Sequence, residues 1–459
     1  MMSKKILEMN SDELKSHLSS GLITICVVGI GRIGLPTALS FANSGLSTIG
    51  LDINEELVNN VNSGIYPLKD EPEYDKIFDK VISEKKFVAT TNIKESVSKA
   101  DVVLLSLPTP MDSNNIPDYT ALRLVGSQLS EYLQPGSLVI VESTIEPGFV
   151  ENELISIIEN SKNNLLAEKT FGIGVCPETA NPGEIMVDFT KLPRLVAGIN
   201  SKITELIYEI YHFVFPVELI KMPNCKTANA VKLTTNVFRD VNIAFINELS
   251  ILFEKLGIDT KVVLEAAKTK YNFQVHYPGA GVGGPCLPIN SYQFLNSANK
   301  FDDGLLTIIK ASRKRNESMP LYVINMIHEV FNNIGKQIKN SSFLILGVSY
   351  KPNVRDIQLS PAEIVIKKLQ DQGATVKIYD PYFISTSVFG IKTENNLEHA
   401  LSEVDAAILL TAHREFLEIN PSFLKSTMKS PIVIDTRSIF DVSTAKEAGL
   451  IFRSLGRKF

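Results

Sequence analysis

The sequence has few cysteines and no long hydrophobic run. Its 459 residues include only four cysteines, which are widely spaced: Cys26, Cys176, Cys225 and Cys286. This spacing supports neither a disulfide framework nor a CxxC zinc site, so we predict no metal site. The longest apolar runs, such as residues 25–30, have the length of a strand and are too short for a transmembrane span.

An excess of positive charge is also lacking. Lys and Arg number 46 and Asp and Glu 51, for a net charge of −5, which gives no electrostatic reason to expect nucleic acid or an anionic membrane as a partner. Lys4 and Lys5 precede acidic residues rather than an apolar core, so we expect no signal peptide and a cytoplasmic protein. Residues 3–20 are predicted to form a short surface helix.

The first half of the chain alternates short apolar runs with helical segments. The composition, 44% hydrophobic and 21% charged, is typical of a globular protein, and the length suggests two or three domains. Continuous apolar runs indicate strands buried on both faces, as in a parallel sheet with a helix such as 35–44 between strands. The predicted strands are residues 24–29, 47–52, 101–107, 137–142 and 169–176.

The middle of the chain predicts one long helix. Residues 224–256 contain neither Pro nor Gly, and Gly257 can cap the C-terminus. At about 1.5 Å per residue the helix would be about 50 Å long, so we interpret it as a spine between two domains and as a dimer contact. Two shorter helices joined by a kink are the alternative. The apolar residues recur every three or four positions, at Val237, Val241, Ala244, Phe245, Leu249, Leu252 and Leu256.

A glycine-rich turn after the first strand indicates a dinucleotide site. Gly29, Gly31 and Gly34 form GxGxxG around Arg32 and Ile33, where backbone N–H groups and a helix N-terminus can meet a pyrophosphate. The next strand ends in Asp52, at about the 20-residue spacing expected for a ribose ligand. Residues 53–56 lack Arg and Lys, which favours NAD over NADP. The alternative is a glycine-rich turn without a ligand.

After about residue 320 the alternation of strands and helices returns without this glycine signature. The expected strands are residues 342–347, 375–380, 406–410 and 431–435, with a helix at 361–372. We therefore predict an α/β protein with two Rossmann-like, doubly wound domains joined by a long central helix.

The thiol of Cys286 lies in the segment GAGVGGPCLP, residues 279–288. Four glycines and two prolines suit a loop where a ligand approaches the backbone, and a thiolate is a strong nucleophile once its pKa is lowered. The alternative is a small buried apolar side chain, which we expect of Cys26, Cys176 and Cys225. An NAD domain combined with a nucleophilic Cys suggests that an aldehyde is held covalently, oxidised again and released by hydrolysis.

Two further positions suggest a site. Lys232 and Asn236 are four apart on the long helix and share a face, where a cation and an amide can stabilise an oxyanion; a solvated surface pair is the alternative. Glu178 follows the C-terminal end of a strand, where open α/β sheets keep their sites. It suits a base or a carboxylate that orients water, and equally an N-cap or a surface acid.

Several segments in order resemble the UDP-sugar 6-dehydrogenase family along nearly the whole chain. The forms GGPCLP and FRDVNIAF are closest to the UDP-N-acetylhexosamine branch, especially the UDP-N-acetyl-D-mannosamine dehydrogenases. The matching segments are residues 29–36, SLPTP at 106–110, ESTIEPG at 142–148, CPETANPG at 176–183, KLTTNVFRDVNIAFINE at 232–248, residues 281–288, and GVSYKPNVRDIQLSP at 347–361.

The resemblance implies a role for each matching residue. Cys286 corresponds to the catalytic thiol, Lys232 and Asn236 to the pair that stabilises the oxyanion, Glu178 to the acid in thioester hydrolysis, and Thr144 to the hydroxyl that positions water. The cofactor set gains Thr109 and Thr144. The substrate set comprises Glu178, Lys232, Asn236, Arg239, Gly283, Lys351 and Arg437.

Two positions depart from the family pattern. Asn290 stands where the family usually has an Asp in the catalytic set, and an amide cannot accept a proton as a carboxylate does. Thr179 stands where the acetylhexosamine branch usually has Arg, which bears on the identity of the sugar more than on the reaction.

The resemblance implies an oxidoreductase that converts the C6 hydroxyl of a UDP-N-acetylhexosamine to a uronate and reduces two molecules of NAD. The expected substrate is UDP-N-acetyl-D-mannosamine. UDP-N-acetylglucosamine and UDP-glucose are alternative substrates. A two-electron hydroxyacid dehydrogenase or an inactive nucleotide-sugar binding protein would be a different function. The family also implies a homodimer, polysaccharide biosynthesis, and three domains: NAD-binding at 1–215, central helical at 216–320 and UDP-binding at 321–459.

Overall fold

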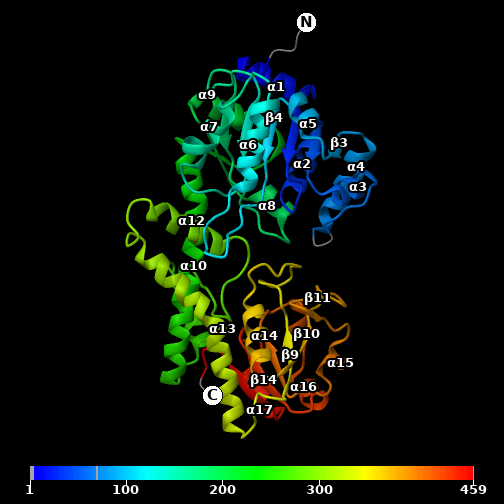
Figure 1. Ribbon diagram of the computed structural model, residues 1–459. Coiled ribbons are helices and arrows are strands. Elements are labelled where there is room, and N and C mark those ends of the chain that lie inside the picture. The colour runs from blue at the N-terminus through cyan, green and yellow to red at the C-terminus, as the bar shows by residue number, and fades with distance from the viewer. Residues whose placement is uncertain (1–4, 69–70, 458–459) are drawn as a thin grey trace. The chain divides into compact units, whose positions relative to one another are not determined.

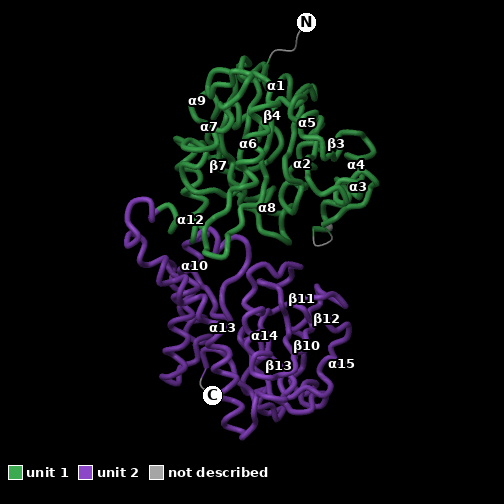
Figure 2. Tube along the Cα trace, in the orientation of Figure 1, with its two compact units in different colours: residues 1–235, 292–297 green, residues 236–291, 298–459 purple. Residues whose placement is uncertain are grey.

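The computed structural model describes residues 5–68 and 71–457. The chain divides into two compact units (Figure 2). Unit 1 comprises residues 1–235 with the segment Tyr292–Ser297. Unit 2 comprises Asn236–Ser291 and Ala298–Phe459.

Unit 1 is built on one eight-stranded sheet with the order β3-β2-β1-β4-β5-β6-β7-β8. Neighbouring strands are parallel except β6 and β7. From β1 the chain first adds strands on one side, β2 and β3, and then on the other, beginning with β4. The point between β1 and β4 is therefore the switch point of the strand order, where open α/β sheets bind their ligands. The strands are β1 (Thr24–Val28), β2 (Ser47–Leu51), β3 (Phe87–Thr90), β4 (Val102–Leu105), β5 (Leu138–Val141), β6 (Gly172–Val175), β7 (Arg194–Gly198) and β8 (Leu219–Lys221).

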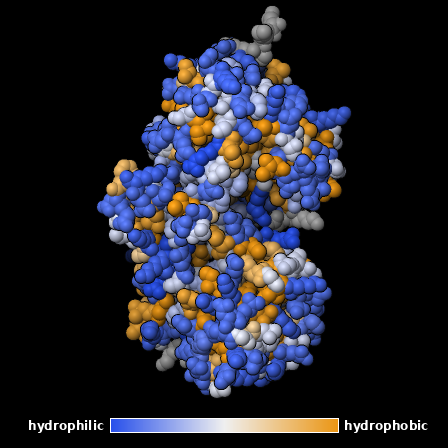
Figure 3. Space-filling model, in the orientation of Figure 1, coloured by the Kyte–Doolittle hydropathy of each residue, from blue (hydrophilic) through white to orange (hydrophobic). Residues whose placement is uncertain are grey.

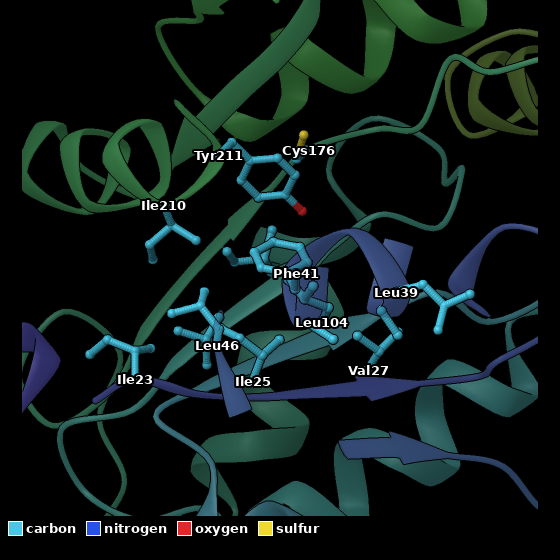
Figure 4. Packing of buried hydrophobic residues seen from close by; sticks show 14 of the residues in the cluster. Ile23, Ile25, Val27, Leu39, Phe41, Leu46, Leu104, Cys176, Ile210 and Tyr211 are labelled. Atoms are coloured by element: carbon cyan, nitrogen blue, oxygen red, sulfur yellow. The ribbon is translucent and has the colours of Figure 1, made fainter. Parts of the chain in front are cut away.

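Helices cover both faces of this sheet, because its central strands are apolar on both sides. Every residue of β4 and β5 is buried, and two hydrophobic clusters occupy the two faces. Figure 4 shows part of one cluster, where Phe41, Tyr211 and Cys176 pack together. The helices are α1 (Ser11–Ser19), α2 (Gly34–Asn43), α3 (Glu55–Asn62), α4 (Asp75–Ser83), α5 (Ile93–Lys99), α6 (Thr120–Tyr132), α7 (Ile155–Glu159), α8 (Ile185–Lys191) and α9 (Ser201–Val214).

The long helix is present as predicted. α10 (Cys225–Leu256) is one helix of 32 residues (Figure 1), so the kinked alternative is wrong. Gly257 follows it at φ +73°, which suits glycine at a helix C-terminus. Three further helices follow: α11 (Thr260–Ala267), α12 (Leu287–Asn299) and α13 (Thr307–Asn333). The sequence did not predict α13, which contains Pro320, and the expected boundary at 320/321 falls inside it.

Unit 2 contains a five-stranded parallel sheet with the order β10-β9-β13-β14-β15. Four of these strands match the predicted ranges to within two residues. Hydrophobic clusters again lie on the two faces. The elements are β9 (Ser342–Leu346), α14 (Pro361–Asp371), β10 (Thr375–Tyr379), the hairpin β11 (Ser387–Val388) and β12 (Ile391–Lys392), α15 (Leu397–Leu401), β13 (Ala406–Leu409), α16 (Pro421–Thr427), β14 (Ile432–Asp435), α17 (Val442–Glu447) and β15 (Ile451–Ser454). The expected α/β class with Rossmann-like sheets is confirmed.

Within the described ranges, none of the helices combines the length and the apolar character that a membrane crossing requires. The visible face in Figure 3 mixes hydrophilic residues (blue) with hydrophobic ones (orange) on both units. Scattered exposed apolar residues of this kind are normal for a folded protein.

Candidate active site

The glycine-rich turn of unit 1 leaves no room for side chains at two positions. Gly29 adopts φ +89°, and a Cβ there would lie 2.5 Å from the carbonyl oxygen of Ser106. A Cβ on Gly34 would overlap the carbonyl oxygen of Gly29. At Gly31, by contrast, no atom of the residues that the structure describes lies within 4 Å of such a Cβ. The turn is therefore closed against the protein and open at Gly31, where a ligand can come close to the backbone.

Asp52 stands at the end of β2 as predicted. Its carboxylate accepts hydrogen bonds from the backbone N–H groups of Ile30, at 3.0 Å, and Asn54, at 3.0 Å, and it is half-buried. Arg32, on the turn, lies 4.0 Å from the carboxylate of Glu71. A glycine cradle beside an accessible carboxylate fits a dinucleotide, with the pyrophosphate at Gly31 and the ribose at Asp52. Ile33 directly precedes α2, whose N-terminus faces this turn.

Two threonines of the predicted cofactor set lie together beyond β4 and β5. The hydroxyl of Thr109 donates to the carbonyl oxygen of Thr144 at 2.9 Å. The amide of Gln293 donates to the same oxygen at 3.0 Å. Both threonines are half-buried. They lie beyond the carboxyl ends of parallel strands, which is the same end of the sheet as the glycine turn.

Glu178 is held inside unit 1. The residue is 8% exposed and follows β6, so the interpretation as a surface acid is wrong. One carboxylate oxygen accepts from the backbone N–H groups of Thr179 and Ala180, each at 2.7 Å. The other accepts from the guanidinium of Arg194 at 2.8 Å. The structure thus gives Glu178 a fixed orientation and a cationic partner.

Lys232 is also buried, at 8% exposure. Asn236, one turn further along α10, is half-buried. The alternative of a solvated surface pair is therefore wrong. Arg239, expected to bind substrate, is exposed on the same helix.

Cys286 occupies the residue before α12 in unit 2. It is the partly exposed one of the four cysteines, all of which lie in the described ranges. Its carbonyl oxygen accepts from the N–H of Asn290 at 2.9 Å, and the side-chain oxygen of Asn290 accepts from the amide of Asn236 at 2.6 Å. Asn236, Asn290 and the cysteine turn are thus tied together.

The other three cysteines are buried, as expected. Burial raises the pKa of each of these thiols, Cys26, Cys176 and Cys225, to about 12. They stay uncharged at neutral pH and cannot act as nucleophiles.

The glycines before Cys286 let the loop lie against other parts of unit 2. A Cβ on Gly283 would overlap the carbonyl oxygen of Leu359, and one on Gly284 would lie 2.5 Å from the ring of Tyr350. A Cβ on Gly279 would overlap the guanidinium of Arg437, which donates to the carbonyl oxygen of Pro278 at 3.4 Å. Arg437 therefore lies beside the loop that carries the thiol.

Lys351 follows Tyr350 in the chain and is half-buried. Because the ring of Tyr350 packs against Gly284, the segment with Lys351 runs close to the cysteine loop. Sequence reasoning expected Lys351 and Arg437 near the site, and both belong to the surroundings of this loop within unit 2.

The predicted residues are thus divided between the two units. Unit 1 carries the glycine turn, Asp52, Thr109, Thr144, Glu178 and Lys232, and unit 2 carries Asn236, Arg239, Gly283, Cys286, Asn290, Lys351 and Arg437.

Sequence reasoning gave no role to three residues around Glu178. Arg194 opens β7, Tyr211 lies on α9, and Glu142 comes directly after β5; all three are buried. The hydroxyl of Tyr211 donates to Glu142 at 2.6 Å. The motif ESTIEPG contained Glu142, but no local pattern links it to Arg194 or Tyr211, because the contacts join segments far apart in the chain.

Three segments of the chain match the domains of one family, the UDP-glucose/GDP-mannose dehydrogenases. Residues 23–214 match its NAD binding domain, residues 226–318 its central domain and residues 344–442 its UDP binding domain. The NAD binding match covers the glycine turn and Asp52, and it confirms NAD as the cofactor.

Full-length relatives agree. The UDP-N-acetyl-D-mannosamine dehydrogenase of Pyrococcus horikoshii is 33% identical over 94% of this chain and 99% of its own length. The solved structure of that organism's UDP-D-ManNAc dehydrogenase superposes with a TM-score of 0.87 at 32% identity, covering 95% of this chain and 99% of the other. The UDP-N-acetyl-D-glucosamine 6-dehydrogenase of Salmonella typhi is 29% identical over 90% of this chain and 95% of its own. The chain therefore belongs to the UDP-glucose/GDP-mannose dehydrogenase family and carries its NAD-binding, central and UDP-binding domains in that order.

Proposed function

We propose that this protein oxidises the C6 hydroxymethyl group of a UDP-N-acetylhexosamine, best UDP-N-acetyl-D-mannosamine, to the carboxylate. The observation that carries the proposal is the position of Cys286: a partly exposed thiol in a glycine-rich turn at the start of a helix, in a chain that also carries an NAD binding domain. A simple alcohol dehydrogenase has no use for such a thiol.

The chemistry requires two oxidations at one carbon. NAD, when bound at the glycine turn, accepts the hydride in each of them. After the first oxidation, the Cys286 sulfur adds to the C6 aldehyde and forms a thiohemiacetal. Loss of a second hydride from C6 gives a thioester, and water then adds to that carbon, displaces the thiol and leaves the carboxylate. In total, the sugar and one water molecule lose two hydrides and three protons, and the carboxylate keeps the water oxygen.

The chain supplies groups for each charge that develops. Lys232 and Asn236 stabilise the oxyanion at C6 in the thiohemiacetal and during hydrolysis. The fixed carboxylate of Glu178 takes the proton of the attacking water, and the Thr144 hydroxyl orients that water. Asn290 holds Asn236 through its side-chain oxygen, so we give it a positioning role.

The substrate is held by unit 2 in this proposal. A UDP binding domain matches residues 344–442, which include Lys351 and Arg437, two cations suited to phosphate oxygens. Arg239 and the backbone at Gly283 complete the expected contacts. The choice of UDP-N-acetyl-D-mannosamine rests on the names of the similar proteins. The residue after Glu178 does not support it, because Thr179 stands where the acetylhexosamine branch usually has Arg.

A panel assay tests the function. Purified protein with NAD is offered UDP-N-acetyl-D-mannosamine, UDP-N-acetyl-D-glucosamine and UDP-glucose separately. We expect the highest NADH release with the first, and uronate formation abolished in C286S, because an alkoxide forms less readily than a thiolate and its ester hydrolyses poorly. Oxidation of none of these sugars, or wild-type uronate yield in C286S, would refute the proposal.

We further propose a homodimer built on α10. Phe238, Phe245 and Leu252 recur at seven-residue intervals on its surface, and each is about half exposed. Such a row suits packing against another helix. We expect F245E to remain folded, because Phe245 is exposed, and to sediment as a monomer where the wild type sediments as a dimer. A wild-type monomer would contradict this arrangement.

The cytoplasmic location, the use of the product in polysaccharide biosynthesis, and the three domain ranges 1–215, 216–320 and 321–459 stay predictions.

A further inference from the structure

A buried cluster of charged groups lies behind Glu178 in unit 1. Glu142, directly after β5, is 1% exposed, Arg194 at the start of β7 is 2% exposed, and Tyr211 of α9 is fully buried. Two carboxyl groups thus share the neighbourhood of one guanidinium. The proposed mechanism uses Glu178 alone and gives no role to Glu142, Arg194 and Tyr211.

The contacts divide the cluster into two pairs. Arg194 donates to Glu178 at 2.8 Å, and Tyr211 donates to the Oε1 atom of Glu142 at 2.6 Å. The backbone joins the pairs, since the N–H of Glu178 donates to the carbonyl oxygen of Glu142 at 3.3 Å. Among the described residues, the Oε2 atom of Glu142 and the Nη2 atom of Arg194 find no hydrogen-bond partner. Each pair therefore has one polar atom to spare.

Aromatic rings hold Arg194 in place. Its guanidinium lies 3.9 Å from the ring centre of Phe215 and 4.3 Å from that of Phe189. Tyr211 stacks on Phe215 with centres 5.6 Å apart and meets Phe41 edge to face; Figure 4 labels Tyr211 and Phe41. A cation fixed between rings cannot turn toward solvent, so its charge stays available to the two carboxyl groups.

One fixed positive charge cannot balance two buried carboxylates. Taking a carboxylate out of water is costly unless it is paired. Burial, and then the charge of Glu178, raise the pKa of Glu142 to about 7, while Arg194 and Tyr211 act in the opposite direction.

The thiol and the two phenols around Glu142 keep their charge state near neutral pH. Burial raises the pKa of the Cys176 thiol to about 12. Burial also raises the pKa of Tyr211 well above its usual value, and that of Tyr74, which faces Arg194 and Glu178 from the segment before α4. Compared with this thiol and these phenols, Glu142 is the group whose charge changes in the neutral range.

We propose that Glu142 is a positioning residue that sets how strongly Arg194 holds Glu178. Uncharged Glu142 leaves the guanidinium wholly to Glu178, which is then a weak proton acceptor. Ionised Glu142 competes for the same cation through its spare oxygen, and Glu178 becomes a better acceptor for the proton of water. This inference rests on the proposed role of Glu178 in thioester hydrolysis.

Three variants test the proposal. E142Q keeps the shape and removes the charge, so it mimics uncharged Glu142. Y211F removes the donor that favours the ionised form. E209Q is the matched control: Glu209 is a buried carboxyl on the same helix as Tyr211, bound instead to Ser11, at 2.7 Å, and Lys15, at 3.2 Å.

The first measurement is the rate of uronate release in a single turnover, followed across the neutral pH range. We expect the wild type and E209Q to accelerate severalfold as the pH rises through 7. In E142Q we expect this step to be lost, with the rate staying near the wild-type value at low pH. Persistence of the step in E142Q would overturn the positioning role and leave the proposed function intact.

The second measurement does not depend on activity. Infrared difference spectra follow the C=O stretch of protonated carboxyl groups as the pH rises. We expect one band to disappear near pH 7 in the wild type and E209Q and to be missing in E142Q. In Y211F it should disappear about one pH unit higher, the worth of one hydrogen bond to a charged group. An unchanged band in E142Q, or no upward shift in Y211F, would refute the cluster's charge assignment even if no UDP-sugar were oxidised.

Discussion

The first strand of each sheet along the chain, β1 in unit 1 and β9 in unit 2, is followed by the same kind of glycine turn. Strand β1 is followed by Gly29 at φ +89°, and β9 is followed by Gly347 at φ +82°. In each unit the next backbone N–H donates to an aspartate that comes after the neighbouring strand, to Asp52 at 3.0 Å and to Asp380 at 2.8 Å. A strand, a glycine at positive φ, a second strand and an acid therefore recur in both halves of the chain.

The two aspartates differ in what else they meet. Asp52 is half-buried, and its other bond is to a backbone N–H of its own turn. Asp380 is fully buried and accepts in addition from the N–H of Ser349, at 3.2 Å, and from the Nε2 atom of His413, at 3.1 Å. The ring of His413 stacks on Tyr382. In unit 2 the His413 side chain thus binds Asp380, whereas the corresponding Asp52 of unit 1 remains accessible.

This difference shows that the strand–glycine–aspartate unit is a folding device, and that its use as a cofactor site depends on the next few residues of the turn. In unit 1 the turn continues through Gly31 and Gly34 and stays open to a ligand. In unit 2 it continues through Ser349 and Tyr350, and the ring of Tyr350 packs against the cysteine loop. The second sheet therefore does not carry a second dinucleotide site of the same kind.

The loss of the buried aspartate of unit 2 should have the strongest effect, a loss of stability. D380A removes the acceptor of several buried donors, so we expect a loss of about 3–5 kcal/mol in the free energy of unfolding, measured with urea. NAD affinity should not change, because the glycine turn lies in unit 1. A loss of NAD affinity with unchanged stability would contradict the structural role.

The pH dependence sharpens this prediction. Burial alone would raise the pKa of Asp380, but the hydrogen bond and charge of His413 and the backbone donors hold it below its usual value. The carboxylate therefore contributes stability above the unfolded-state pKa of about 3.9, and this is lost as the pH falls toward the lower folded value. The stability difference between wild type and D380N should be constant near neutrality and shrink below about pH 4.

A smaller effect is expected at the glycine turn. G34A must push the backbone of Gly29 aside, so we expect a loss of stability of about 1–3 kcal/mol together with weaker NAD binding. G31A is the matched control. A methyl group there meets none of the described residues but would stand where we expect the pyrophosphate. Calorimetry should therefore show weaker NAD binding with unchanged unfolding. Wild-type affinity in G31A would place the dinucleotide elsewhere.

The smallest effect is expected at Asp52. D52N keeps the shape of the side chain and removes its charge, so we expect the fold to persist and NAD affinity to fall about tenfold, the worth of one hydrogen bond to a charged group. Without the negative charge, discrimination against the 2′-phosphate of NADP should also weaken. The measurement is the ratio of initial rates with NAD and NADP, and an unchanged ratio would contradict the ribose assignment.

The strands and α10 could be predicted from the sequence because each gives a local signal. Runs such as Val102–Leu105 are apolar throughout, and α10 has helical periodicity without Gly or Pro. α13 could not be predicted because a proline such as Pro320 normally ends a helix. In the structure Pro320 is buried in the interior of this 27-residue helix. Its interior position shows that packing within unit 2 overrides the local preference.

The cofactor turn could be predicted because chemistry and motif coincide in one segment, Gly29–Gly34. The role of Cys286 comes from a similar local motif and stays a prediction. The surroundings of Glu178 could not be predicted. Arg194 and Tyr211 meet it only through contacts between distant segments, and nothing local in the sequence distinguishes a buried arginine from an exposed one. The difference between Asp52 and Asp380 was equally hidden, because His413 reaches Asp380 from a distant segment of the chain.

The most direct test of the account is the number of NADH molecules formed for each molecule of UDP-sugar consumed. The assay uses the wild-type protein with limiting UDP-N-acetyl-D-mannosamine and excess NAD, and quantifies NADH and the UDP-sugar consumed at completion. Covalent oxidation through Cys286 predicts a ratio of two. A ratio of one, with an aldehyde as the final product, would contradict it.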